Sequence, residues 1–117
     1  MCHVLIIEDD WIIADHIALL VQSAGAMSID MAATEEEAVS RAQAHRPAVI
    51  VSDVSLQQGL GPSAVARIIA MLGEVPVMFV TGEPRSFQPV SPDMPVLHKP
   101  VDDRMLVATF KAIAPLA

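Results

Sequence analysis

Acidic side chains in two separate segments are the clearest sign of chemistry in this sequence. Glu8, Asp9 and Asp10 follow one short apolar run, and Asp53 follows another. Each run is typical of a buried strand, so these acids stand where strands end. Carboxylates gathered in one crevice repel each other unless a cation lies between them. Oxygen ligands that leave room for several waters favour Mg²⁺ over Zn²⁺, so the acids predict a magnesium site.

Two further polar side chains follow later apolar runs. Thr81 supplies a hydroxyl donor and Lys99 a movable positive charge. A phosphoryl group in transfer spreads its negative charge over three oxygens, so its catalysis consists mostly of positioning and charge neutralisation. A carboxylate can act as the nucleophile in such a reaction. The inventory of carboxylates, hydroxyl and ammonium therefore predicts phosphoryl transfer.

The elements that would position these groups alternate along the chain. Helical patterns separate five apolar runs that we expect to be strands: Val4–Ile7, Ser28–Met31, Val49–Ser52, Val75–Val80 and Val96–His98. Alternation of this kind predicts a parallel sheet with right-handed crossovers. Five strands fit a flavodoxin-like, doubly wound (βα)5 domain of order 2-1-3-4-5, which we expect to span residues 1–117. Ligands of such α/β folds bind beyond the carboxyl ends of the strands, where all the groups above are expected.

The expected helices carry their own end signals, with one exception. Thr34 is placed to cap the second helix, Gly73 to close the third, and the last helix is expected to begin near Asp102. A fourth helix belongs between the last two strands if the alternation holds throughout. The four prolines of Glu83–Pro95 favour a short, irregular or mobile segment there.

Composition limits the possible partners and location. Seven basic and fourteen acidic residues give a net charge of −7, so direct binding of nucleic acid is not expected. A cation or a partner with a basic patch is more plausible. No apolar run approaches the ~20 residues needed to cross a bilayer, and the start does not resemble a signal peptide, so no membrane insertion is expected. Cys2 is the only cysteine, which excludes an internal disulfide and favours a cytoplasmic location.

Four segments, taken in order and at their separations, resemble one known family. VLIIEDD, VIVSD, FVTG and HKP are similar to the motifs of response-regulator receiver domains of two-component signalling. The resemblance implies that Asp53 is the phospho-acceptor. It also implies a Mg²⁺ site in which Asp53 and Asp9 are direct ligands, Glu8 acts largely through water, and the backbone carbonyl of Ser55 is a further ligand.

The same resemblance assigns the remaining groups and the partners. Thr81 and Lys99 would hold the phosphoryl oxygens, and the bond between Lys99 and Pro100 would be cis. The phosphodonor would be a sensor histidine kinase or phosphotransfer protein, and the output would be an unidentified downstream protein target. Such a domain catalyses its own phosphorylation and dephosphorylation, and it is a signalling switch rather than a metabolic enzyme.

Some positions depart from the common receiver pattern. The loop after Asp53 reads SLQQGLGPSA, which is long and rich in glycine. Gly82 stands where alanine is frequent, and Val96 stands where many receivers carry a Tyr or Phe that moves on activation. The segment FVTG, the missing aromatic and the proline-rich segment after Gly82 together resemble the FATGUY-type receivers, although Glu83-Pro84 does not complete that motif. Because Val96 is short, we expect the segment from Gly82 to Pro95 to carry the conformational change.

Two other functions compete with this interpretation. A phosphatase of the haloacid-dehalogenase type also uses a strand-end aspartate, but its Asp-x-Asp motif would need an acid where this chain has Ser55. A receiver-like module that works without phosphate is the other alternative. The complete set of acceptor, metal and phosphoryl-binding residues argues against it.

Several polar residues have ordinary structural explanations. Asp10 is either a third acid of the site or an acid at the start of a helix. The four histidines are expected to be scattered, without metal-binding spacing, and to serve surface or packing roles: His3, His16, His45 and His98.

Overall fold

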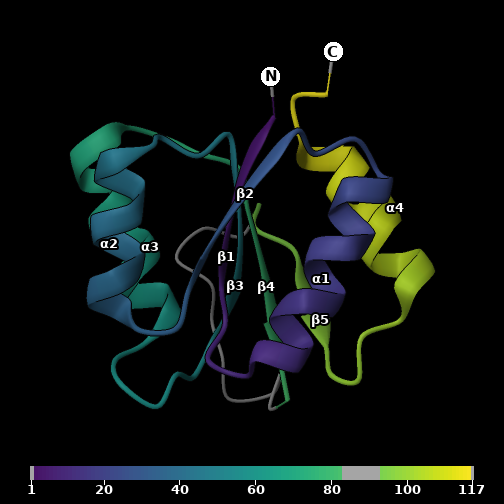
Figure 1. Cartoon of the computed structure of the whole chain (residues 1–117), viewed down its shortest axis with the longest axis horizontal. Helices are drawn as coiled ribbons and strands as arrows, with labels where there is room; N and C mark the ends of the chain where they lie inside the picture. The colour runs from purple at the N-terminus through teal and green to yellow at the C-terminus, as the bar shows by residue number, and fades with distance from the viewer. Residues whose placement is uncertain (1, 83–92, 117) are drawn as a thin grey trace.

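The computed structural model describes residues 2–82 and 93–116. Strands and helices alternate in it as the sequence predicts, except between the last two strands, where residues 83–92 are not described (Figure 1). The elements are β1 (His3–Ile7), α1 (Trp11–Ser23), β2 (Ser28–Ala32), α2 (Glu35–Ala44), β3 (Val49–Asp53), α3 (Gly61–Leu72), β4 (Val77–Thr81), β5 (Val96–His98) and α4 (Asp103–Ile113).

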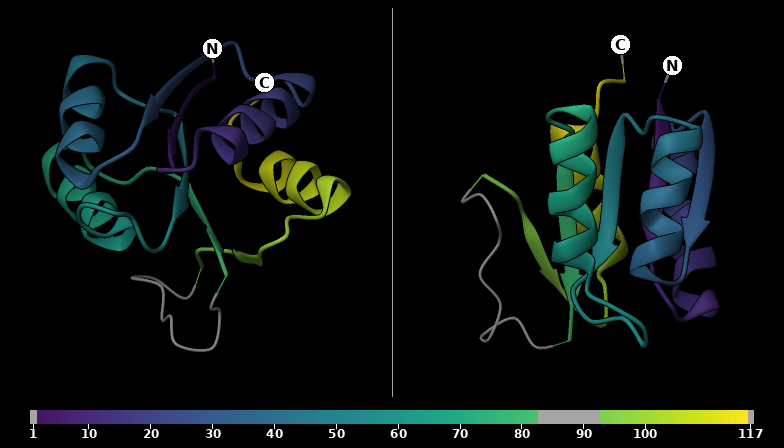
Figure 2. Two further views of the ribbon diagram at one scale, coloured as in Figure 1. Left: turned by 60° about the horizontal axis from the view of Figure 1, so that its bottom comes forward. Right: turned by 90° about the vertical axis from the view of Figure 1, so that its left-hand side faces the viewer.

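The five strands form one parallel sheet in the order β2-β1-β3-β4-β5. This confirms the flavodoxin-like order. The sheet reverses its winding between β1 and β3, and the carboxyl ends of all strands lie at one edge, at the bottom of Figure 1 and turned forward in the left view of Figure 2. The two chain termini lie at the opposite edge.

Helices cover both faces of the sheet. The helices α1 and α4 lie on one face, and α2 and α3 lie on the other (Figure 1). Alternate residues of each strand point to opposite faces, so Val4 and Ile6 of β1 pack with α1 and α4, whereas Leu5 and Ile7 face α2 and α3. A sheet covered on both faces explains why β1, β3 and β4 are apolar and buried along their length.

The helix ends follow the signals in the sequence. The Thr34 side chain accepts a hydrogen bond from the amide of Glu37, and Asp102 caps α4 in the same way. Asp10 is the N-cap of α1, where its side chain accepts from the amides of Ile12 and Ile13. This decides between the two explanations of Asp10 in favour of the helix cap.

The structure corrects some of the predicted strand features and does not test the predicted fourth helix. The strand β4 begins at Val77 rather than at Val75, since Pro76 has no amide to donate to a neighbouring strand. The strand β2 is an edge strand and is largely exposed, unlike the buried central strands. Of the segment Glu83–Pro95, residues 83–92 lie outside the described residues, so the fourth helix stays a prediction. No helix of the described residues is long and apolar enough to cross a membrane.

Candidate functional site

The groups predicted to do chemistry stand at the carboxyl edge of the sheet. Glu8 and Asp9 follow β1, Asp53 is the last residue of β3, Thr81 is the last residue of β4, and Lys99 follows β5. The parallel register sets these strand ends side by side, because Ile7 pairs with Ser52, one residue before Asp53. Residues far apart in the sequence therefore meet at one place.

The three acids converge closely enough to share a cation. One carboxylate oxygen from each of Glu8, Asp9 and Asp53 lies within 4.8 Å of the others. Glu8 and Asp53 are buried, and Asp9 is half-buried. Hard oxygen donors that remain partly open to water suit Mg²⁺, so the residues present fit the ion that the sequence predicts.

Lys99 balances part of the negative charge in this cluster. Its Nζ donates to Glu8 Oε1 at 2.8 Å and to Asp53 Oδ2 at 3.2 Å. Burial acts to lower the pKa of Lys99, but the contacts with Glu8 and Asp53 outweigh it and hold the pKa above its usual value. Lys99 therefore remains charged at neutral pH and bridges two of the acids.

Glu8 is the most perturbed carboxyl group of the site. Burial raises the pKa of Glu8 to about 7, and the charge of Asp53 adds to this effect. Hydrogen bonds from Lys99 and from the amide of Asp10, at 3.1 Å from Oε2, act in the opposite direction without cancelling it. With a pKa of about 7, the Glu8 carboxyl is charged in about half of the molecules at neutral pH, and a bound cation would favour the charged form.

Asp53 is fixed by its neighbours in the chain. Its Oδ1 accepts from the amide of Val54 at 2.8 Å, and its backbone carbonyl accepts from Ser52 Oγ at 2.8 Å. Oδ2 faces Lys99. The carboxylate is therefore held at the end of β3 with one oxygen directed at the ammonium group.

Thr81 and Lys99 are tied together through the backbone. The Lys99 amide donates to the Thr81 carbonyl at 2.8 Å, which continues the pairing of β4 with β5. Thr81 is buried at the end of β4. The peptide bond between Lys99 and Pro100 is cis, as the resemblance implies.

The loop between Asp53 and α3 closes back onto the acids. The Gln57 amide donates to Asp9 Oδ2 at 2.7 Å. Ser55, whose carbonyl is a predicted metal ligand, pairs with Leu60 in an isolated antiparallel bridge. The loop is thus a compact turn that contacts Asp9, a predicted metal ligand.

Glu35 anchors this loop, a role that sequence reasoning missed. Its carboxylate accepts from the Leu60 amide at 3.1 Å, from Ser63 Oγ at 2.8 Å and from Arg67 at 3.0 Å. The hydroxyl of Ser63, the amide of Leu60 and the guanidinium of Arg67 together lower the pKa of Glu35. In the sequence Glu35 reads only as a favourable acid in the first turn of a helix.

Gly61, the first residue of α3, is a second missed residue. A Cβ atom there would stand 1.7 Å from the Asp53 carbonyl oxygen and 2.5 Å from Ser52 Oγ. The Gly61 amide also donates to the Val54 carbonyl at 3.1 Å. A side chain at this position would displace the backbone of Asp53. The glycine-rich loop was the available signal, but nothing local identified which glycine makes the contact.

The two predicted switch positions have ordinary surroundings in the structure. Gly82 is exposed, and a Cβ atom there would meet none of the described residues within 4 Å. Val96 pairs with Phe79 and packs against the core beneath α2 and α3. The residues that directly follow Gly82 lie outside the described ones, so the switch stays a prediction.

The expectation that all four histidines are scattered was wrong for two of them. The rings of His3 and His45 stack with their centroids 3.5 Å apart. His16 is exposed and contacts Asp103 at 2.7 Å, and His98 is exposed as well. His3 and His45 come from different elements, so no spacing in the sequence pointed to their contact.

The comparisons with known proteins agree with this geometry. A family model described as the response regulator receiver domain matches residues 4–111. The chain is 36% identical over 85 residues to the phyllosphere-induced regulator PhyR of Methylorubrum extorquens, a match that covers 72% of this chain and 32% of that protein.

Two solved structures extend the likeness to three dimensions. The receiver domain of PhyR from Erythrobacter litoralis is 29% identical with a TM-score of 0.85, covering 95% of this chain and 88% of that one. The anti-anti-sigma factor PhyR of Bartonella quintana is 30% identical with a TM-score of 0.77, covering 96% and 47%. The chain therefore spans less than half the length of the Methylorubrum and Bartonella proteins.

Proposed function

The chain belongs to the response regulator receiver domain family, and we propose that Asp53 accepts a phosphoryl group in a Mg²⁺-dependent reaction. Receiver domains are signalling switches rather than metabolic enzymes. The observation that carries the proposal is the pairing of the Asp53 carboxylate with Lys99 beside two further acids at one edge of the sheet.

Glu8, Asp9 and Asp53 would hold the metal, together with the backbone carbonyl of Ser55. When bound, Mg²⁺ neutralises the acids and stabilises negative charge on the transferred group. Lys99 is the only residue seen to neutralise Glu8 and Asp53 among the described contacts, and it cannot balance all three acids alone. The charge deficit of the cluster supports a divalent cation as the missing partner.

In the proposed reaction a carboxylate oxygen of Asp53 attacks the phosphorus of a phosphohistidine on a partner protein. The new O–P bond forms as the P–N bond breaks, and the electron pair of that bond leaves with the imidazole. Lys99 stands 3.2 Å from Asp53 Oδ2 and can follow the phosphoryl oxygens as their charge develops. Thr81, at the neighbouring strand end, supplies a hydroxyl to the same oxygens.

The chain would also catalyse hydrolysis of its own aspartyl phosphate, using the same residues. The phosphodonor would be a sensor histidine kinase or phosphotransfer protein. The output would be a protein partner whose binding follows phosphorylation, with the change carried by the segment from Gly82 to Pro95 rather than by Val96. The name anti-anti-sigma factor of the Bartonella relative suggests a partner in transcriptional regulation, as a property of a protein longer than this chain.

A small phosphodonor tests the acceptor directly. Acetyl phosphate with Mg²⁺ should add one acid-labile phosphoryl group, detected by intact mass, and Asp53→Asn should remove it. Asp15→Asn, a change of an exposed aspartate on α1, is the matched control and should leave the yield unchanged. A full yield in the Asp53 variant would refute the assignment of the acceptor. Absence of any adduct in the wild type would favour the phosphate-independent module.

A further inference from the structure

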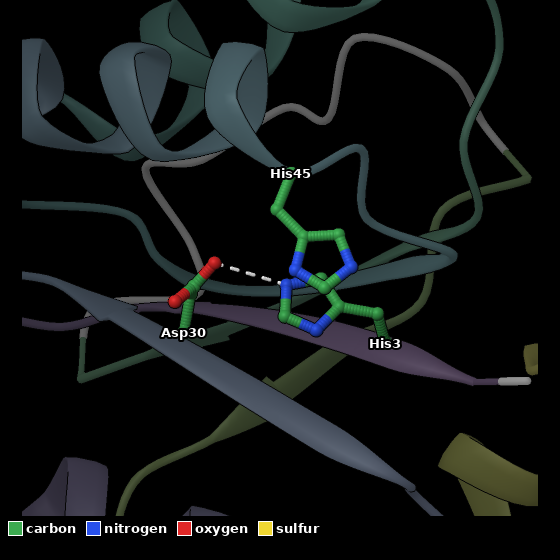
Figure 3. Close-up of side chains that lie close together, drawn as sticks. All are labelled: His3, Asp30 and His45. Atoms are coloured by element: carbon green, nitrogen blue, oxygen red, sulfur yellow. Dashed lines mark hydrogen bonds and ion pairs between the residues drawn. The ribbon is translucent and has the colours of Figure 1, made fainter.

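A second group of ligand-type side chains lies at the opposite edge of the sheet from Asp53. His3 starts β1, Asp30 lies in β2, and His45 directly follows α2. One potential ligand atom from each residue lies within 4.8 Å of the others. Figure 3 shows the ring of His45 over the ring of His3, with Asp30 beside them.

The strand register explains how His3 and Asp30 meet. His3 pairs with Ser28, and Asp30 projects from the same side of β2 as Ser28 because side chains alternate along a strand. His3 Nε2 lies 3.0 Å from Asp30 Oδ2, and Nδ1 lies 2.7 Å from Ser28 Oγ. His3 shares the face of β1 that α2 covers, which brings the end of that helix over its ring.

Ser28 gives His3 the support that metal-binding histidines commonly have. A ligating imidazole binds the metal through one nitrogen and hydrogen-bonds through the other, which fixes its tautomer and orientation. The Ser28 hydroxyl can donate to Nδ1 while Nε2–H donates to Asp30. It can equally accept from Nδ1–H, which frees the lone pair of Nε2 for a cation. His3 is buried, with 6% of its surface exposed, so its ring direction is fixed by packing as well.

From this geometry we propose that His3, Asp30 and His45 form a binding site for Zn²⁺ or a similar divalent transition ion. Two imidazoles and one carboxylate are a donor set that Zn²⁺ favours over Mg²⁺. Bonds of about 2.0–2.2 Å in a tetrahedral site place ligand atoms about 3.3 Å apart. The His3–Asp30 pair, at 3.0 Å, is already close to this separation.

His45 completes the site by a rotation of its side chain. The two rings are stacked nearly parallel, so their nitrogen lone pairs lie in parallel planes and do not point at one common position. To bind the same ion as His3, the His45 ring must therefore rotate. His45 is exposed and caps the end of α2, where its backbone amide donates to the Arg41 carbonyl. The His45 backbone is therefore held in place, whereas its exposed ring is free to rotate toward a shared ion. Three protein ligands leave a fourth position for water or for a group of a bound partner.

A simple packing role accounts for only part of the arrangement. The contacts with Ser28 and Asp30 satisfy the polar atoms of buried His3 without any metal. They do not account for a second imidazole, that of the exposed His45, whose ring centroid lies 3.5 Å from that of His3. A shared cation gives both rings and the carboxylate one common function.

Zinc titration of the tag-free protein in excess Mg²⁺ tests the proposal, since Mg²⁺ would occupy the proposed metal site at Glu8, Asp9 and Asp53. Calorimetry should show one Zn²⁺ per chain for the wild type. His45→Ala should weaken that binding about tenfold or more. His16→Ala is the matched control. It removes a different exposed histidine, which contacts Asp103, and it should bind Zn²⁺ as tightly as the wild type does. Equal affinities of the wild type and His45→Ala would overturn the site.

A second measurement identifies the ligands without relying on affinity. In ¹H–¹⁵N spectra of the imidazoles, one equivalent of Zn²⁺ should shift the ring nitrogens of His3 and His45 and leave those of His16 and His98 in place. His45→Ala removes only an exposed side chain and should keep the fold, which far-ultraviolet circular dichroism would verify. Shifts confined to His16 or His98 would also refute the proposal. Neither result depends on phosphorylation, so this test can fail while Asp53 remains the acceptor.

Discussion

At the scale of single residues, the buried carboxyl of Glu8 shows how the site tolerates three neighbouring acids. Glu8 has 4% of its surface exposed and contacts Lys99 and the Asp10 amide. Because its pKa is raised to about 7, it accepts a proton more readily in the folded than in the unfolded chain. In the metal-free site the charged form of Glu8 is therefore disfavoured by burial and by repulsion from Asp53, and a bound cation would stabilise it.

This leads to a prediction for stability in the absence of divalent cations. The folded pKa of about 7 exceeds the usual value of 4.5, so stability from protonated Glu8 is fully present below pH 4.5 and is lost as pH rises through 7. Glu8→Gln cannot lose this proton. Across that range the wild type should lose on the order of 3 kcal/mol relative to the variant.

Urea unfolding at several pH values with a chelator present measures the effect. Glu74→Gln, which changes an exposed glutamate, is the matched control and should follow the wild type within about 0.5 kcal/mol at every pH. Parallel pH profiles of the wild type and Glu8→Gln would contradict the prediction.

At the scale of elements, the acceptor depends on how α3 begins. The first residue of that helix, Gly61, packs against the backbone of Asp53, while Glu35 at the start of α2 holds Leu60 and Ser63. Two helix starts thus fix the loop that carries Ser55. The position of the acceptor therefore depends on the packing of α2 against α3 as well as on β3.

Replacing Gly61 by alanine tests this arrangement. Alanine normally stabilises a helix relative to glycine, but here its Cβ would stand 1.7 Å from the Asp53 carbonyl oxygen. We expect a loss of about 1–3 kcal/mol in unfolding free energy and slower phosphorylation by acetyl phosphate, because the backbone of Asp53 must move. Urea denaturation and intact mass over time measure the two effects.

Gly82→Ala is the matched control for stability. Among residues 2–82 and 93–116 the new methyl group would meet nothing within 4 Å, and Gly82 does not adopt a positive φ. Its unfolding free energy should stay within about 0.5 kcal/mol of the wild type. Equal effects of the two substitutions would show that close packing at Gly61 is not required.

At the scale of the whole molecule, the acidic site and the histidine cluster are separated by about the length of a strand of the sheet. The acids lie at the carboxyl ends of the strands and the histidine cluster at the amino ends. The five residues of β1 run from one to the other, about 16 Å at the usual rise per residue. Oxygen donors at one end and imidazoles at the other favour different ions.

We therefore expect the two sites to act independently. Mg²⁺ should raise the melting temperature of His45→Ala as much as that of the wild type, and Zn²⁺ in excess Mg²⁺ should raise it for Asp53→Asn but not for His45→Ala. The change in unfolding free energy of the variant that carries both Asp53→Asn and His45→Ala should equal the sum of the changes in the two single variants within about 0.5 kcal/mol. Thermal denaturation of the four proteins measures this. A Mg²⁺ response that disappears in His45→Ala would contradict independence.

The sequence by itself determined the fold and the group of residues around Asp53. Alternating strands and helices specify a parallel sheet, and a parallel sheet brings the carboxyl ends of its strands together. Glu8, Asp53, Thr81 and Lys99 stand at those ends, so local pattern and topology were enough to place them at one edge. The expected cap at Thr34 and the expected helix start near Asp102 were also local signals, because a cap bonds within its own first turn.

Only the tertiary structure decided the contacts between elements. Glu35 contacts the loop after Asp53, Gly61 packs against the Asp53 carbonyl, and His3 stacks on His45. In each case the two partners are far apart in sequence or are joined by a loop whose conformation the sequence does not predict. No periodicity encodes such contacts, because they depend on how far two helices approach and which way a loop folds back. For His3 and His45 the reason is specific: an edge-strand register and the end of a helix must both be known before the two rings can be placed together.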